Sequence, residues 1–118
     1  MQIRRVVADL TVAHPRQAAE FYRSLGLEVV MDHGWIVTLA DPADPTRQLS
    51  LMSRDATAPV DPVVSIEVDD VDAAHDATRT VGFTIIHPLT DEEWGVRRFF
   101  FADADGNVVN VLGDPRRG

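Results

Sequence analysis

Cysteine is absent from this 118-residue sequence, which excludes disulfides, thiolate nucleophiles and thiolate metal sites. Long hydrophobic runs are also missing, since no stretch approaches the roughly 18 consecutive apolar residues of a membrane span. The opening segment, MQIRRVVADL, lacks the continuous apolar core of a signal peptide. These absences predict a soluble, cytoplasmic protein without a membrane partner.

Positive charge is scarce as well. The chain carries 19 Asp and Glu residues against 11 Lys and Arg residues, which gives a formal net charge of -8. A surface of this sign repels phosphate backbones and anionic lipids and attracts cations, so we expect no nucleic-acid partner. The hydrophobic content of 45% in a chain of this length predicts a single domain with a modest core.

An internal repeat divides the sequence into two similar halves. Residues 7–30 align with residues 63–86 at a constant shift, which places Val12 over Val68 and Gly26 over Gly82 (82 − 26 = 56). Apolar residues fall on apolar residues throughout the aligned segments. Self-similarity at a fixed shift indicates that the two halves of the chain share one supersecondary unit.

Each repeat begins with the alternating apolar pattern of a strand and continues with a helix. Pro15 suits the first turn of the first helix, and Asp70 suits the N-cap of the second. Gly26 and Gly82 stand where a helix ends in a left-handed residue. Both halves therefore share the same strand, helix and helix-end signals.

Three further strands follow in each half, at residues 27–31, 35–40 and 48–52 and then at residues 83–87, 96–102 and 107–112. The sequence therefore predicts an α+β fold of two tandem βαβββ modules within one domain. Module one covers about residues 3–53 and module two about residues 63–113, and a proline-containing linker of about residues 54–62 joins them.

The segments AAEFYRSLGLEV and FFFADADGNVVNVL resemble the vicinal oxygen chelate superfamily, which includes glyoxalases, bleomycin-resistance proteins and extradiol dioxygenases. The resemblance implies a curved mixed sheet around a cleft, and it implies a homodimer. Enzymes of this superfamily bind a divalent metal through the first and last strands of each module, which here places Val7, Ser50, Val63 and Asn110 at the ligand positions. Valine offers no lone pair, so the resemblance implies a metal-free branch with no cofactor.

Strand alternation predicts which side chains enter the cleft. If Ala8 faces the helix, then Asp9 faces the cleft, and the repeat places Glu67 there too. Two carboxylates in a concave wall favour a cationic or amine-bearing ligand. Two alternatives stay open: the carboxylates are hydrated or paired with Arg97 or Arg98, or one of them is a general base. Of the two arginines, alternation places one in the cleft without indicating which.

Two tryptophans, Trp35 and Trp94, occupy equivalent places, each directly after an acidic loop of its module. Tryptophans beside a cleft suit stacking on planar rings, and a cation there gains about 0.5 to 2 kcal/mol from each ring. The alternative is that each tryptophan caps the end of its module's core. Ser50 and Asn110 should enter the same cleft from the last strands.

The sequence thus predicts a metal-independent binding protein of the bleomycin-resistance type, which sequesters a planar or cationic small molecule, with antibiotics among the candidates. An alternative is an enzyme of the same superfamily, a lyase, isomerase or hydrolase that uses Asp9 or Glu67 as base or a displaced metal site. A dimeric stress or regulatory protein also stays open. The predicted ligand-binding residues are Asp9, Trp35, Ser50, Glu67, Trp94 and Asn110.

Overall fold

The computed structural model describes residues 1–115 and contains eight strands and two helices over that range. The first module consists of β1 (Ile3–Thr11), α1 (Pro15–Arg23), β2 (Glu28–Asp32), β3 (Ile36–Asp41) and β4 (Asp44–Met52). The second consists of β5 (Val64–Val68), α2 (Val71–Val81), β6 (Thr84–Asp91), β7 (Arg97–Ala102) and β8 (Val108–Gly113). The predicted α+β fold of tandem βαβββ modules is therefore confirmed.

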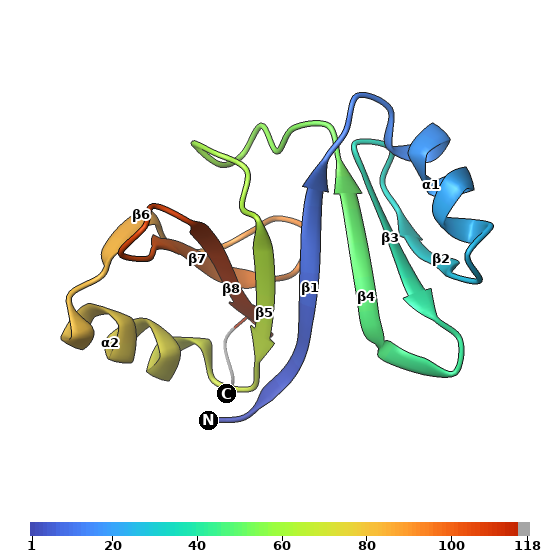
Figure 1. The fold of residues 1–118 in the computed structure, drawn as a ribbon. Helices are drawn as coiled ribbons and strands as arrows, with labels where there is room; N and C mark the ends of the chain where they lie inside the picture. Colours follow the sequence, from blue (N-terminus) through green and yellow to red (C-terminus); the bar gives the residue numbers. More distant parts are fainter. Residues whose placement is uncertain (116–118) are drawn as a thin grey trace.

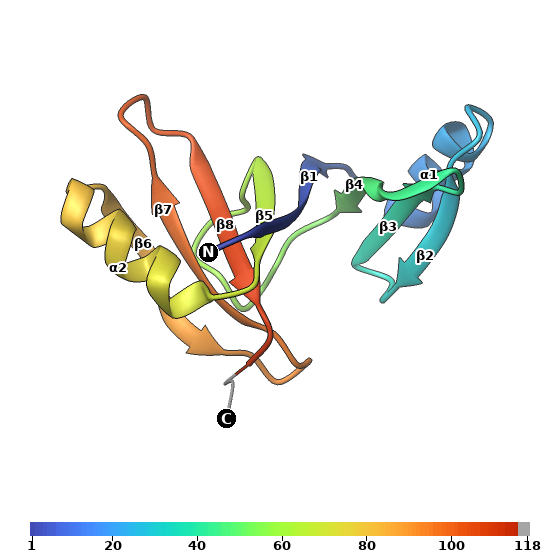
Figure 2. The same ribbon diagram turned by 90° about the horizontal axis from the view of Figure 1, so that it is seen from below.

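All eight strands form one mixed sheet in the order β2-β3-β4-β1-β5-β8-β7-β6. Within each module the first strand pairs in parallel with the last, as β1 does with β4 and β5 does with β8. The modules join where β1 pairs antiparallel with β5, in the middle of the sheet (Figure 1). The sheet is curved rather than flat, and α1 and α2 lie toward its two ends (Figure 2).

The internal repeat is visible as an approximate two-fold axis at this junction. Ala8 and Val64, which are equivalent in the repeat, lie directly opposite each other in the β1–β5 pairing. The next equivalent pair, Asp9 and Ser65, therefore points to the same face from either side of the axis. The pairing of β1 with β5 thus brings the equivalent positions Asp9 and Ser65 close together at the centre of the sheet.

Local sequence signals for the helices are confirmed. Pro15 is the first residue of α1, where its missing N–H is not needed. Asp70 caps α2 and accepts a hydrogen bond from the Ala73 backbone N–H at 3.0 Å. Gly82 ends α2 in the left-handed region with φ +97°. Neither of these two described helices is long and apolar enough to cross a membrane.

Each module has its own apolar core between its helix and its outer strands. In module one, Ala19 of α1 packs with Leu39 and Leu51 of β3 and β4. In module two, Val71 of α2 packs with Phe99 of β7. Because both cores lie on the helix side, the opposite face of the sheet is left to form the concave surface.

The exposure of β1 corrects one prediction. Alternation along the strand is as expected, but neither helix covers β1, because α1 packs on β2 to β4 and α2 on β6 to β8. Ala8 and Leu10 are therefore exposed on the convex face instead of facing a helix. The buried face of β1 is the concave one, where Val7 is 3% and Asp9 6% exposed.

The strand predicted to end at His87 continues through Pro88 to Asp91. Proline removes a backbone donor and is tolerated on edge strands, and β6 is the edge of the sheet. The pairing register of β6 with β7 shifts on either side of this segment. The irregularity sets the position of the following loop, which carries Glu92 and Trp94.

Candidate ligand-binding site

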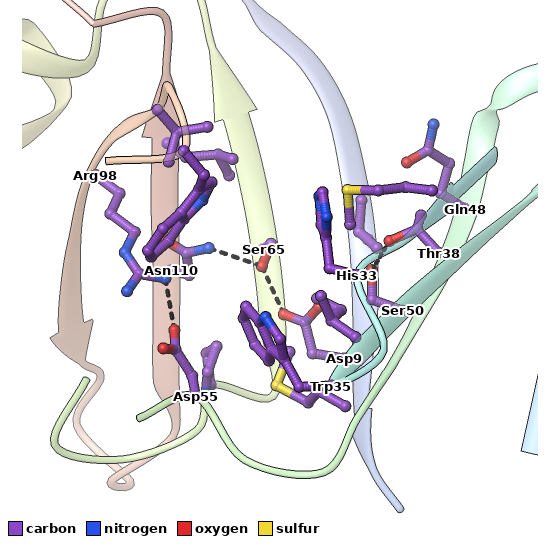
Figure 3. A pocket seen from close by; sticks show the side chains of 18 of the residues that line it. Asp9, His33, Trp35, Thr38, Gln48, Ser50, Asp55, Ser65, Arg98 and Asn110 are labelled. Carbon is purple, nitrogen blue, oxygen red and sulfur yellow. Dashed lines mark hydrogen bonds and ion pairs between the residues drawn. The ribbon is translucent and has the colours of Figure 1, made fainter. Parts of the chain in front are cut away.

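A cavity of about 620 Å³ opens on the concave face of the sheet and is lined from both modules (Figure 3). Its volume falls within the range of small-molecule sites, roughly 300 to 1,000 Å³. Five of the six predicted ligand-binding residues line it, namely Asp9, Trp35, Ser50, Trp94 and Asn110. The structure thus brings together residues as far apart in the chain as Asp9 and Asn110, which are 101 positions apart (110 − 9 = 101).

Glu67, the sixth predicted residue, is not among the residues that line the cavity. Its carboxylate accepts a hydrogen bond from Arg5 Nε at 2.5 Å and forms an ion pair with that guanidinium. Arg5 also donates to the Gln48 side chain. The expectation of two free carboxylates in the cleft is therefore corrected to one, because a neighbouring arginine on β1 neutralises Glu67.

A hydrogen-bonded row crosses the floor of the cavity over three adjacent strands (Figure 3). Asn110 Nδ2 on β8 donates to Ser65 Oγ on β5 at 3.0 Å, and Ser65 Oγ donates to Asp9 Oδ2 on β1 at 2.6 Å. Ser65 and Asp9 are the equivalent pair at the two-fold axis. The hydrogen bond between Ser65 and Asp9 forms because β1 and β5 pair in the register that places Ala8 opposite Val64.

The floor continues into module one on the other side of Asp9. Ser50 of β4 lies beside Asp9 in the pairing register, as Asn110 lies beside Ser65. Ser50 Oγ shares a hydrogen bond of 2.8 Å with Thr38 Oγ1. The two halves of the floor are therefore related by the repeat but differ in chemistry, since the carboxylate stands in module one and the amide in module two.

Asp9 is the unusual charged group of this floor. It is 6% exposed, and among the described residues it has no ion-pair partner. Burial raises the pKa of Asp9 to about 6, although the Ser65 hydroxyl and the charge of Arg5 act to lower it. Arg5 cannot compensate it fully because it already pairs with Glu67. At neutral pH the cavity therefore holds a carboxylate that is mostly ionised and lacks a counter-ion.

This burial makes a prediction for stability. The pKa of Asp9 is about 6 in the folded chain against a reference of 3.8, so the folded state binds the proton more tightly. The resulting cost to folding is absent below pH 3.8, grows between 3.8 and 6, and is fully present above 6, where it reaches about 3 kcal/mol. Asp9→Asn should therefore raise the free energy of unfolding at pH 8, and the gain should shrink as the pH falls toward 4.

Urea unfolding of both proteins across this pH range is the measurement. Asparagine keeps the shape of the side chain and an acceptor for the Ser65 hydroxyl, so packing changes little. A destabilised variant at pH 8, or a difference independent of pH, would contradict the assignment of a buried, uncompensated carboxylate.

Aromatic side chains from both modules meet beside this floor. Trp35 and Trp94 line the cavity, with ring centroids 6.4 Å apart and an interplanar angle of 71°. Trp94 is 43% exposed, and the guanidinium of Arg98 lies 4.8 Å from its ring centroid. The tryptophans therefore do not cap separate module cores but form an edge-to-face pair at the cavity, where ring faces are available to a planar ligand.

Arg98 is the arginine that enters the cavity, which answers the question left open by the sequence. Its side chain is 6% exposed and pairs with Asp55 at 2.9 Å and Glu92 at 2.6 Å. It also donates to Thr57 Oγ1 at 3.0 Å, and Glu92 contacts His87 Nε2 at 3.1 Å. Two carboxylates thus neutralise the guanidinium. Arg98 therefore links parts of the structure and contributes no unpaired positive charge to the cavity.

Asp55 brings the linker between the modules into this network. Burial raises the pKa of Asp55, but hydrogen bonds from Thr57 and the charge of Arg98 outweigh burial and hold it below the ordinary value. Asp55 is therefore ionised whenever the protein is folded near neutral pH. Arg97, the other arginine of β7, differs from Arg98 because it pairs with Asp72 and Asp91, whose side chains are largely exposed.

The four positions that the resemblance assigns to a metal do not fit one. Val7 and Val63 have no donor atoms, and Val63 does not line the cavity. Ser50 is engaged with Thr38, and Asn110 offers one amide oxygen. No group of three or more His, Cys, Asp or Glu side chains is placed to hold a metal within residues 1–115. These residues fit an organic ligand better than a divalent cation.

The strand alternation that places Asp9 on the concave face places its repeat equivalent Ser65 there too, and Ser65 lines the cavity. Sequence reasoning missed two loop residues that line the cavity. His33 lines the cavity from the loop between β2 and β3, and Asp55 lines it from the linker. Neither has a periodic pattern around it, because loops carry no alternation from which the direction of a side chain can be predicted.

Comparison with known proteins agrees with this geometry. A family model described as the Glyoxalase/Bleomycin resistance protein/Dioxygenase superfamily matches residues 2–111. The chain belongs to this superfamily. A search of curated proteins finds no match.

Solved structures share the fold at low sequence identity. One described as a glyoxalase/bleomycin resistance protein/dioxygenase superfamily member from Vibrio splendidus is 18% identical, covers 96% of this chain and 100% of its own, and has a TM-score of 0.67. One described as NAD-dependent benzaldehyde dehydrogenase from Legionella pneumophila is 18% identical over 93% and 99% of the chains, with a TM-score of 0.76. Methylmalonyl-CoA epimerase from Mycobacterium tuberculosis is 18% identical over 97% and 88%, with a TM-score of 0.65. These likenesses support the fold alone.

Proposed function

We propose that this chain is a metal-independent binding protein of the bleomycin-resistance type that sequesters a planar or cationic small molecule, with antibiotics among the candidates. The observation that carries the proposal is the Asp9 carboxylate, which is buried in the cavity without an ion-pair partner among the described residues. A cationic ligand would supply the missing counter-charge and remove the cost of keeping this group buried.

The electrostatic surroundings favour the same ligand class. The other charged groups that line the cavity within residues 1–115, Arg5, Asp55 and Arg98, are each held in ion pairs, so Asp9 carries the unpaired charge there. The formal net charge of -8 adds an attraction that raises the encounter rate with cations. An anionic ligand would meet repulsion from both sources.

The tryptophan pair supplies the apolar part of the recognition. Trp35 and Trp94 present large ring surfaces at the cavity, and these stack on planar rings and attract cations. Charge from Asp9 and stacking from the tryptophans therefore act on the same ligand, a flat molecule with a positive charge.

Isothermal titration calorimetry at pH 8 with matched bicyclic probes tests the proposal. Naphthamidinium and naphthyltrimethylammonium should bind and quench tryptophan fluorescence, whereas naphthoate, with the same rings and the opposite charge, should bind at least about tenfold more weakly. Mass spectrometry of the recovered probe should show an unchanged mass. Equal binding of cation and anion would contradict the proposal.

A second candidate function, catalysis by proton transfer, is favoured by one observation. A pKa of about 6 would let Asp9 serve as a general base near neutral pH. Glu67 is paired with Arg5 and does not line the cavity, so the enzymatic alternative rests on Asp9 alone. Turnover of a ligand, with a rate that rises through pH 6 and is abolished by Asp9→Asn, would favour the enzyme over the binder.

A further inference from the structure

One hydrogen-bond acceptor in the cavity is left over once the protein's own contacts are assigned. Asn110 is 7% exposed, and its Oδ1 is buried with no hydrogen-bond partner among the described residues. A buried acceptor in this condition costs about 1 to 3 kcal/mol. Such groups are rare in folded proteins and call for a physical explanation.

The direction of the hydrogen-bonded row shows that this acceptor is fixed in place. An ionised Asp9 can only accept, so the single proton of Ser65 Oγ must point to Asp9 Oδ2. Ser65 can then only accept from its other neighbour, which turns the NH₂ group of Asn110 toward it. The Oδ1 atom of Asn110 must therefore face away from Ser65. Rotating the amide would place two acceptors against each other.

The same row leaves a second acceptor nearby. Asp9 uses Oδ2 for Ser65, and no hydrogen bond within residues 1–115 occupies Oδ1. Asp9 and Asn110 both line the cavity and flank β5, with one serine hydroxyl between them. The cavity floor therefore holds two unused acceptor oxygens, one on a carboxylate and one on an amide, on either side of the Ser65 hydroxyl.

We propose that the cavity recognises a planar cation with two N–H donors on one carbon, such as an amidinium or a protonated amino-heterocycle, which donates to Asp9 and to Asn110 Oδ1. This inference rests on the proposed function and makes it more specific. A planar N–C–N group presents two parallel donors in a fixed geometry, and its charge is delocalised over a flat surface that suits the neighbouring tryptophans. A quaternary ammonium carries the same charge but has no donor for either oxygen.

Two probes of equal charge separate this inference from the proposed function. On the wild-type protein at pH 8, naphthamidinium should bind at least about tenfold more tightly than naphthyltrimethylammonium in calorimetric titrations. Equal affinities would overturn the two-donor inference and leave cation binding intact. Failure of both cations to bind would overturn both proposals.

Asn110→Leu provides the second arm, because leucine keeps a similar volume and removes the acceptor. The affinity for naphthamidinium should fall about tenfold further than the affinity for naphthyltrimethylammonium, because the second probe has no donor for the lost acceptor. Equal losses for the two probes would overturn the inference. If the variant does not fold, the comparison of probes on the wild-type protein still decides the question.

Discussion

Asp9→Asn is expected to reduce the affinity for naphthyltrimethylammonium at pH 8 by about 30-fold or more. A close charge pair in a buried site contributes about 2 kcal/mol or more, and every 1.4 kcal/mol is tenfold in affinity. The substitution removes the charge that lacks a partner and keeps the side-chain shape. Calorimetric titration of the variant and the wild-type protein is the measurement.

Asp105→Asn is the matched control for this experiment. It makes the same chemical change and alters the net charge equally, but Asp105 is exposed in the turn between β7 and β8. Its affinity for the probe should stay within about twofold of the wild-type value. Equal losses in the two variants would mean that overall charge, and not Asp9, determines binding.

Asp9→Asn should also stabilise the unliganded protein, as argued above from its raised pKa. A substitution that improves folding and removes binding identifies a group that the fold retains at a cost. The two measurements together therefore distinguish a ligand-binding carboxylate from a structural one, because removing a structural carboxylate would lower stability.

Arg98→Met is expected to lower the free energy of unfolding by about 3 to 5 kcal/mol. The substitution removes the guanidinium from Asp55 and Glu92, whose side chains are 4% and 9% exposed, and leaves both charges buried without it. Urea unfolding at pH 7 measures the change. The loss should diminish at acidic pH, where the carboxylates can be protonated.

The adjacent arginine gives the control. Arg97→Met breaks pairs with Asp72 and Asp91, whose side chains are 60% and 47% exposed, and exposed pairs contribute about 1 kcal/mol or less. A loss at Arg98 no larger than the loss at Arg97 would contradict the assignment of Arg98 as the buried link between the linker and module two.

The repeat made the fold predictable from sequence. The shift between the halves located each first strand and helix, and the local signals at Pro15 and Asp70 marked where the helices begin. Alternation then placed Asp9 on the concave face, because the two-residue period of a strand fixes direction without knowledge of the rest of the fold. The homodimer and the cytoplasmic location stay predictions.

The pairing of charges could not be predicted in the same way. Glu67 and Asp9 have the same alternation, and only the register of β1 with its neighbours brings Arg5 to Glu67 and Ser65 to Asp9. The helix position over β1 was wrong for a related reason, since strand order decides what a helix covers. Asp55 was missed because a linker has no periodicity.

The most direct test observes the Asp9 carboxyl carbon by NMR during a pH titration, with and without saturating naphthyltrimethylammonium. We expect a pKa of about 6 for Asp9 in the free protein and a lower pKa when the cation is bound, because the cation stabilises the ionised form. A pKa near the ordinary value of 3.8 that does not respond to the probe would contradict the claim that Asp9 is a buried carboxylate held for a cationic ligand.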